Sequence, residues 1–81
     1  MSSVEEIIGL MDEVLEDSSV PKNIRKAVGD AKQRLQSEDD LVVKVSSAIY
    51  SIESITEDVN MPPHARMQIW SIISELEALK E

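Results

Sequence analysis

Residues 61–76 have the sequence MPPHARMQIWSIISEL, and this stretch decides the fold of the chain. Its apolar side chains recur every three or four residues, the spacing that gathers them on one face of an α-helix. The two adjacent prolines fit the opening turn of a helix, where a missing backbone N–H is tolerated. The stretch therefore predicts a helix whose buried face consists of Ala65, Ile69, Ile72, Ile73, Leu76 and Leu79.

The same spacing predicts three helices before this one. The first begins near Ser3, the second covers about residues 21–36, and the third covers about residues 38–57. Ser3 and Ser37 each precede an acidic residue by three positions, the spacing of a capping box that satisfies the free amides at a helix start. No stretch alternates as a β-strand does, so we predict an all-α fold.

The two halves of the chain match each other at a separation of 41 residues. Identical residues at that separation form the pairs Val4 and Val45, Glu16 and Glu57, Asp17 and Asp58, Pro21 and Pro62, Arg25 and Arg66, and Leu35 and Leu76. We interpret the chain as one helical domain, residues 1–81, with a hairpin repeat over residues 1–37 and a second over residues 38–81. Because two repeats are few for a solenoid, we predict a four-helix up-and-down antiparallel bundle; a two-repeat HEAT-like stack is the alternative.

The composition disfavours several classes of protein. The 81 residues allow one domain, and a net charge of −8 disfavours general binding to nucleic acid or to anionic membranes. With no cysteine and a single histidine, the sequence offers no disulfide and no cysteine–histidine zinc site, and we expect no metal and no cofactor. The longest aliphatic run, residues 41–43, is far too short to span a membrane, so we expect a cytoplasmic protein.

A catalytic role is not expected. His64 is the only imidazole of the chain, and it has only unremarkable serines and abundant surface carboxylates as companions. A di-iron bundle would need a glutamate three positions before the histidine, and that residue is Met61. We therefore predict that the protein is not an enzyme.

Four large apolar side chains fall outside the predicted core faces: Val43, Tyr50, Met67 and Trp70. They are either the flank of a broad core or a candidate interface, because Trp, Tyr and Met are enriched where proteins bind each other. The position that matches Trp70 in the first half is Gly29, and a glycine inside a helix costs about 1 kcal/mol relative to alanine. This suggests that a bulky side chain packs over Gly29.

The second predicted helix carries a basic face that consists of Lys22, Arg25, Lys26 and Lys32. Such a face is either simply solvated, or a contact for an acidic partner such as a second copy of the chain, or a phosphate site. Arg25 and Arg66 also occupy matching places near the starts of two helices. For them we predict hairpin-turn salt bridges to Asp17 or Glu57; a clamp for an anion is the alternative.

The tract from 61 to 76, together with VPKNIRKA at residues 20–27, resembles an uncharacterised archaeal protein family, number 0147 among such families. Both motif blocks occur in the order and spacing of that family, and the resemblance covers nearly the whole chain. It implies a four-helix up-and-down bundle in an archaeal cytoplasm. It implies no reaction, ligand or catalytic residue.

Together these observations predict a non-enzymatic helical protein–protein interaction module that binds an unknown protein partner, with a homo-oligomer as one form. The alternative function is a nucleic-acid-associated or ribonucleoprotein accessory protein that acts through the basic face of the second helix. The net charge of −8 makes the nucleic-acid alternative the weaker of the two.

Overall fold

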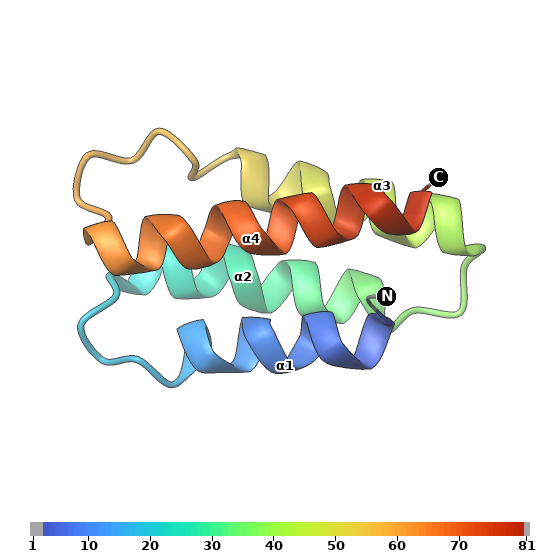
Figure 1. Cartoon of the computed structure of the whole chain (residues 1–81), viewed down its shortest axis with the longest axis horizontal. Helices are drawn as coiled ribbons and strands as arrows, with labels where there is room; N and C mark the ends of the chain where they lie inside the picture. The colour runs from blue at the N-terminus through green and yellow to red at the C-terminus, as the bar shows by residue number, and fades with distance from the viewer. Residues whose placement is uncertain (1–2, 81) are drawn as a thin grey trace.

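A computed structural model describes residues 3–80 of the chain; residues 1, 2 and 81 of the predicted domain lie outside the described range. Four helices make up this range and no strand occurs in it: α1 (Val4–Leu15), α2 (Lys22–Leu35), α3 (Leu41–Glu53) and α4 (Pro63–Lys80). Consecutive helices run in opposite directions, and the two ends of the chain lie at the same end of the molecule (Figure 1). The prediction of an all-α fold is confirmed.

The helices pack as a closed ring rather than as a stack. α1 packs against α2 and α4, and α3 packs against α2 and α4. Within residues 3–80 the diagonal pairs, α1 with α3 and α2 with α4, have no Cα atoms within 8 Å of each other. A stack of two hairpins would bring those same-direction helices together, so the contacts are those of an up-and-down bundle.

The core lies along the axis of this ring and is entirely apolar among the described residues. Each helix contributes a row of buried side chains at helical spacing, as the sequence predicted. The largest fully buried side chains are Ile7, Met11, Ile24, Leu35, Ile52, Ile69, Ile72 and Leu76, with Val14, Val20, Val28 and Val45. Burial of these faces is what holds short helices together in water.

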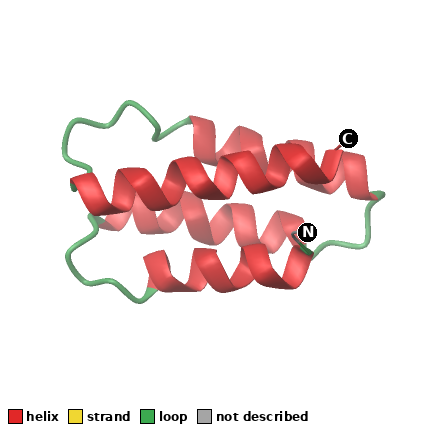
Figure 2. Cartoon of the chain, in the orientation of Figure 1, coloured by secondary structure: helices red, strands yellow, loops and turns green. Residues whose placement is uncertain are grey.

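Loops of irregular backbone join the helices (Figure 2), and they make α3 shorter than predicted. The hydroxyl of Ser3 does cap α1 by accepting the Glu6 N–H at 3.2 Å. The corresponding prediction for Ser37 is wrong, because its hydroxyl contacts Asp39 instead and α3 begins only at Leu41. No helix in residues 3–80 is both long enough and apolar enough to cross a membrane.

Candidate functional site

The second hairpin, α3 with α4, carries an exposed apolar surface. All the exposed large apolar side chains of residues 3–80 lie in it or in its loop: Leu41, Val42, Val43, Tyr50, Val59, Met67 and Trp70. Tyr50 and Met67 are each 73% exposed, and Trp70 is 51% exposed. All four candidate interface residues are therefore on the surface, and the interpretation that they flank a broad core is wrong for Tyr50 and Met67.

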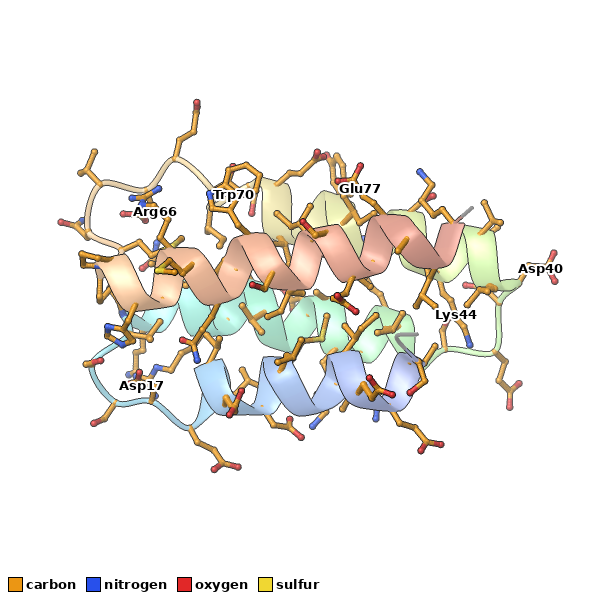
Figure 3. The ribbon with its side chains drawn as sticks, viewed as in Figure 1. Asp17, Asp40, Lys44, Arg66, Trp70 and Glu77 are labelled. Atoms are coloured by element: carbon orange, nitrogen blue, oxygen red, sulfur yellow. The ribbon has the colours of Figure 1, made fainter. Side chains whose placement is uncertain are left out.

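These side chains follow the outer faces of two neighbouring helices. Val43 and Tyr50 are two helical turns apart on α3, and Met67 and Trp70 are one turn apart on α4. Trp70 projects from the side of α4 on which α3 lies (Figure 3). The loop between α3 and α4 adds Val59, which is 90% exposed. We call these five residues the apolar strip.

Charged residues are absent from the two segments that carry Tyr50, Met67 and Trp70. Residues 45–52 on α3 and residues 67–74 on α4 contain no charged side chain, in a chain where 30% of residues are charged. Ser71 and Ser74 are exposed in these segments, whereas Ser46 and Ser47 are half-buried and the Ser47 hydroxyl accepts a hydrogen bond from Arg34 of α2. Depletion of charge around exposed aromatic and Met side chains is the composition typical of the centre of a protein interface.

The exposed apolar surface also includes Val59, Leu41 and Val42, which were not predicted from the sequence. Val59 lies between Asp58 and Asn60 in a loop, so helical periodicity predicts neither burial nor exposure for it. Leu41 and Val42 begin α3, and they are 42% and 54% exposed although they belong to the longest aliphatic run of the chain. That run was the signal that could have identified them, because only part of it can fit a core stripe.

A second cluster of polar residues lies at the end of the bundle where the α1–α2 and α3–α4 loops meet. Each loop forms the same turn around an aspartate. Asp17 Oδ1 accepts the Ser19 N–H at 2.9 Å, and Asp58 Oδ1 accepts the Asn60 N–H at 2.8 Å. The backbone carbonyl of each aspartate also accepts an N–H three residues on, at 3.1 and 3.2 Å.

The two turns are joined by reciprocal side-chain contacts. Asn23 Nδ2 donates to Asp58 Oδ2 at 2.7 Å, and His64 Nε2 lies 2.8 Å from Asp17 Oδ2. Asn23 and His64 are themselves 41 residues apart, so each repeat reaches the aspartate of the other. We call these four residues the turn clasp. Its reciprocity supports the two hairpin repeats over 1–37 and 38–81, which stay a prediction.

The clasp hydrogen bonds favour the ionised aspartates. The Ser19 hydroxyl, then the His64 ring, lower the pKa of Asp17 from 3.8 to about 2. The backbone N–H of Asn60, followed by the Asn23 amide, lowers the pKa of Asp58 below its usual value. Both carboxylates are near the surface, so these contacts orient the turns rather than create a buried charged site.

The predicted hairpin-turn salt bridges are wrong. Arg25 Nε donates to the Val20 carbonyl at 3.0 Å, and the Arg66 guanidinium donates to the carbonyls of Thr56 and Asp58 at 2.9 and 3.0 Å. Neither arginine pairs with Asp17 or Glu57 within the described residues; Asp17 pairs with His64 and Glu57 is exposed. The guanidinium groups donate to turn carbonyls that have no partner within a helix. The carboxylates of Asp17 and Asp58 already accept hydrogen bonds from backbone N–H groups of the turns.

The predicted basic face is interrupted by acidic neighbours. Lys32 Nζ forms a salt bridge with Asp12 Oδ1 of α1 at 2.6 Å, and Lys26 Nζ lies 3.9 Å from Asp30 Oδ2. Arg25 is turned toward the Val20 carbonyl, and Lys22 is exposed. The four cations therefore do not form the uniform positive surface that helix periodicity alone predicted.

Ser19, His64 and Asp17 are in mutual contact, but their geometry does not suit nucleophilic catalysis. Ser19 Oγ lies 3.3 Å from His64 Nε2 and 2.6 Å from Asp17 Oδ1, to which it donates. Catalysis needs the serine and the acid on opposite ring nitrogens, whereas here both approach Nε2. Residues 3–80 also contain no pocket and no group of three residues placed to ligate a metal.

Relatives of this chain are similar to it over most of their length. It is 44% identical over 72 residues to a UPF0147 protein of Methanocaldococcus jannaschii, covering 88% of this chain and 77% of that one. A UPF0147 protein of Archaeoglobus fulgidus is 34% identical over 76 residues, covering 94% and 87%.

Two solved structures are similar to this chain in both sequence and fold. The crystal structure of a protein of unknown function is 44% identical and matches with a TM-score of 0.90, covering 96% of this chain and 90% of that one. A UPF0147 structure from Thermoplasma acidophilum is 37% identical and matches with a TM-score of 0.86, covering 93% and 89%. The family profile described as "Uncharacterised protein family (UPF0147)" matches residues 1–79, and the chain therefore belongs to that family.

Proposed function

We propose that this chain is a non-enzymatic protein–protein interaction module of the cytoplasm, and that the apolar strip is its binding surface. One observation carries the proposal: the large apolar side chains that are exposed lie together on the second hairpin, while the first hairpin exposes none within the described residues. Exposed apolar patches of this kind mark interaction sites on small proteins.

The fold itself does not require the strip. Forty-one residues before Tyr50, Val59, Met67 and Trp70, the first hairpin has Gly9, Ser18, Lys26 and Gly29. The two glycines of the chain thus stand where the second hairpin has its two aromatic residues. Because Tyr50 and Met67 are each 73% exposed, we infer that they serve something other than bundle formation, whereas Trp70 is half-buried.

The strip has the side chains that contribute most to binding energy. Tyr and Trp bury a large area with few rotatable bonds, and Met adapts its shape to a partner. The nearby serines can be covered at lower cost than charged groups, whose burial requires pairing. The nucleic-acid alternative lacks comparable support, because Lys32 and Arg25 are engaged inside the molecule.

Photo-cross-linking from the strip tests the proposal. The variant carries benzoylphenylalanine at position 50 in place of Tyr50, and the matched control carries it in place of Gln33, an exposed residue of α2. After irradiation in native cell extract, we expect a discrete adduct from position 50 and none from position 33. An adduct of equal yield from both positions, or none from position 50, would contradict the proposal.

A further inference from the structure

We propose that the partner of the apolar strip is a second copy of this chain. This inference rests on the proposed function and makes it specific. Two molecules would bring their α3–α4 faces together about a two-fold axis, so that the same surface is used on both sides. The shape, the charge and the area of that surface support such a dimer.

The shape of the strip suits contact with itself. A two-fold interface must be self-complementary, because each residue type of the patch meets the same patch on the partner. The α3–α4 face has both projections and gaps: Tyr50 and Met67 stand out from it, while the exposed serine positions Ser71 and Ser74 leave room between large side chains. Large side chains of one copy can therefore fill the low positions of the other.

The charge distribution also selects this face for self-contact. Two copies each carry a net charge of −8, so most ways of bringing them together place like charges side by side. Residues 45–52 and 67–74, which carry Tyr50, Met67 and Trp70, contain no charged side chain, so two copies can approach at this face with less repulsion than at the acidic surface of α1. A strongly basic partner would be drawn instead to the acidic surface, where α1 carries Glu5, Glu6 and Glu13.

The exposed face of α1 is not a suitable binding site for the apolar strip of a second copy. Gly9 has open space around it and would accept a large side chain, but it stands among Glu5, Glu13 and Glu16 on the exposed face of α1. Covering those carboxylates with Tyr50 and Trp70 would remove water from charges without pairing them. A head-to-tail contact of this kind would also leave each strip open to a further copy, whereas strip-to-strip contact closes after two.

The area of the strip fits a weak dimer. Because an aromatic side chain offers roughly 150–250 Å², the exposed parts of the strip present on the order of 500 Å². A standard interface covers about 800 Å² on each partner, so the surrounding serines and helix backbone must supply the rest. We therefore expect a dissociation constant in the micromolar range, where a dimer is missed in dilute solution.

Sedimentation equilibrium of the full chain between about 5 and 500 μM tests this inference. We expect an average mass that rises toward twice the chain mass. We also expect tighter association at higher salt, because screening weakens the repulsion between two acidic chains. A complex held by opposite charges, including one with nucleic acid, would weaken with salt.

The decisive variant is Met67→Lys, with Gln33→Lys as its matched control. Lysine already occupies the equivalent position 26, so the fold accepts it there, and the change lowers the net negative charge rather than adding to it. We expect Met67→Lys to raise the dissociation constant at least tenfold and Gln33→Lys to leave it within threefold. Met67→Leu should retain association, and circular dichroism confirms that each variant is folded.

The outcomes separate this inference from the proposed function. A wild-type chain that stays monomeric at about 500 μM overturns the second-copy inference, as does association that Met67→Lys leaves unchanged. The mass of the adduct formed from position 50 is a separate test, which bears on both the second-copy inference and the proposed interaction function. An adduct at twice the chain mass supports both; an adduct of another mass supports the proposed function alone; the absence of an adduct contradicts both.

Discussion

Met11 on α1 and Ile52 on α3 lie 41 residues apart and are both fully buried, and the same holds for Val28 on α2 and Ile69 on α4. The outward positions do not correspond in this way. Where the second hairpin exposes Tyr50, Met67 and Trp70, the first has glycine, lysine and glycine. The two hairpins therefore share the residues that build the bundle and differ in the residues that meet solvent or a partner.

This difference separates the requirements of the fold from those of binding. A core position is constrained by its neighbours on other helices, so both hairpins keep apolar residues at most of these positions; the exceptions are Gln68, which matches Ala27, and Lys32, which matches Ile73. A residue on the outer face of a helix has no such neighbours, so its side chain is constrained only by solvent or by a binding partner. The presence of exposed apolar residues on one hairpin and of glycine or lysine at the matching positions of the other is the basis on which we propose the binding surface.

The largest effect is expected from the core pair Met11 and Ile52. Each side chain is fully buried, so Met11→Ala and Ile52→Ala should each lower the free energy of unfolding by about 2–5 kcal/mol. Urea denaturation followed by circular dichroism measures both. If one variant loses this much stability and the other loses clearly less, the two hairpins are not equivalent halves of one core.

A gain in stability is expected at Gln68, which matches the buried Ala27 of the first hairpin. Its Oε1 atom is buried and has no hydrogen-bond partner among the described residues. Replacing it by methionine keeps the length of the side chain and removes the unsatisfied oxygen, so Gln68→Met should raise the free energy of unfolding by about 1–3 kcal/mol. Gln68→Glu, the control, should lower it. A loss of stability in Gln68→Met would show that the amide has a partner after all.

The turn clasp should make stability depend on acid pH. Contacts in the folded chain lower the pKa of Asp17 from 3.8 to about 2, so the folded state favours the ionised form. The resulting stabilisation is present above about pH 4 and is lost as the pH falls toward 2. Asp17→Asn should remove part of this dependence, as measured by urea denaturation at a series of pH values.

The contact between Asn23 and Asp58 allows the same test in the other turn. Asn23→Ala removes the contact to Asp58 in the other turn, where the pKa is also lowered. If the two turns are equivalent, this variant too should flatten the loss of stability between about pH 4 and pH 2. A curve identical to that of the wild type in both variants would show that the clasp contributes nothing to folding.

The smallest effect is expected at the glycines of the first hairpin. A Cβ at Gly9 would meet nothing within 4 Å, and one at Gly29 would lie 3.6 Å from Leu15 Cδ2, an ordinary contact. The large side chain near Gly29 is that of Leu15, and it leaves room for a Cβ, so packing does not require a glycine at this position. Gly9→Ala and Gly29→Ala should each raise the free energy of unfolding by about 0.5–1 kcal/mol, because glycine is a poor helix former. Thermal unfolding measures the gain, and a loss at Gly29 alone would mean that Leu15 cannot shift.

Helical periodicity alone predicts the four helices and most of the core residues on each, because it is local and is visible in any stretch of a dozen residues. It left open whether Tyr50 and Met67 flank a broad core, and the packed bundle shows that they are exposed. The polar contacts follow from the tertiary structure. Asp17 meets His64 from 47 residues away, Lys32 pairs with Asp12 of another helix, and Arg66 reaches turn carbonyls instead of a carboxylate. Such contacts depend on which helices become neighbours and on the path of each loop, and neither leaves a periodic signal in the sequence.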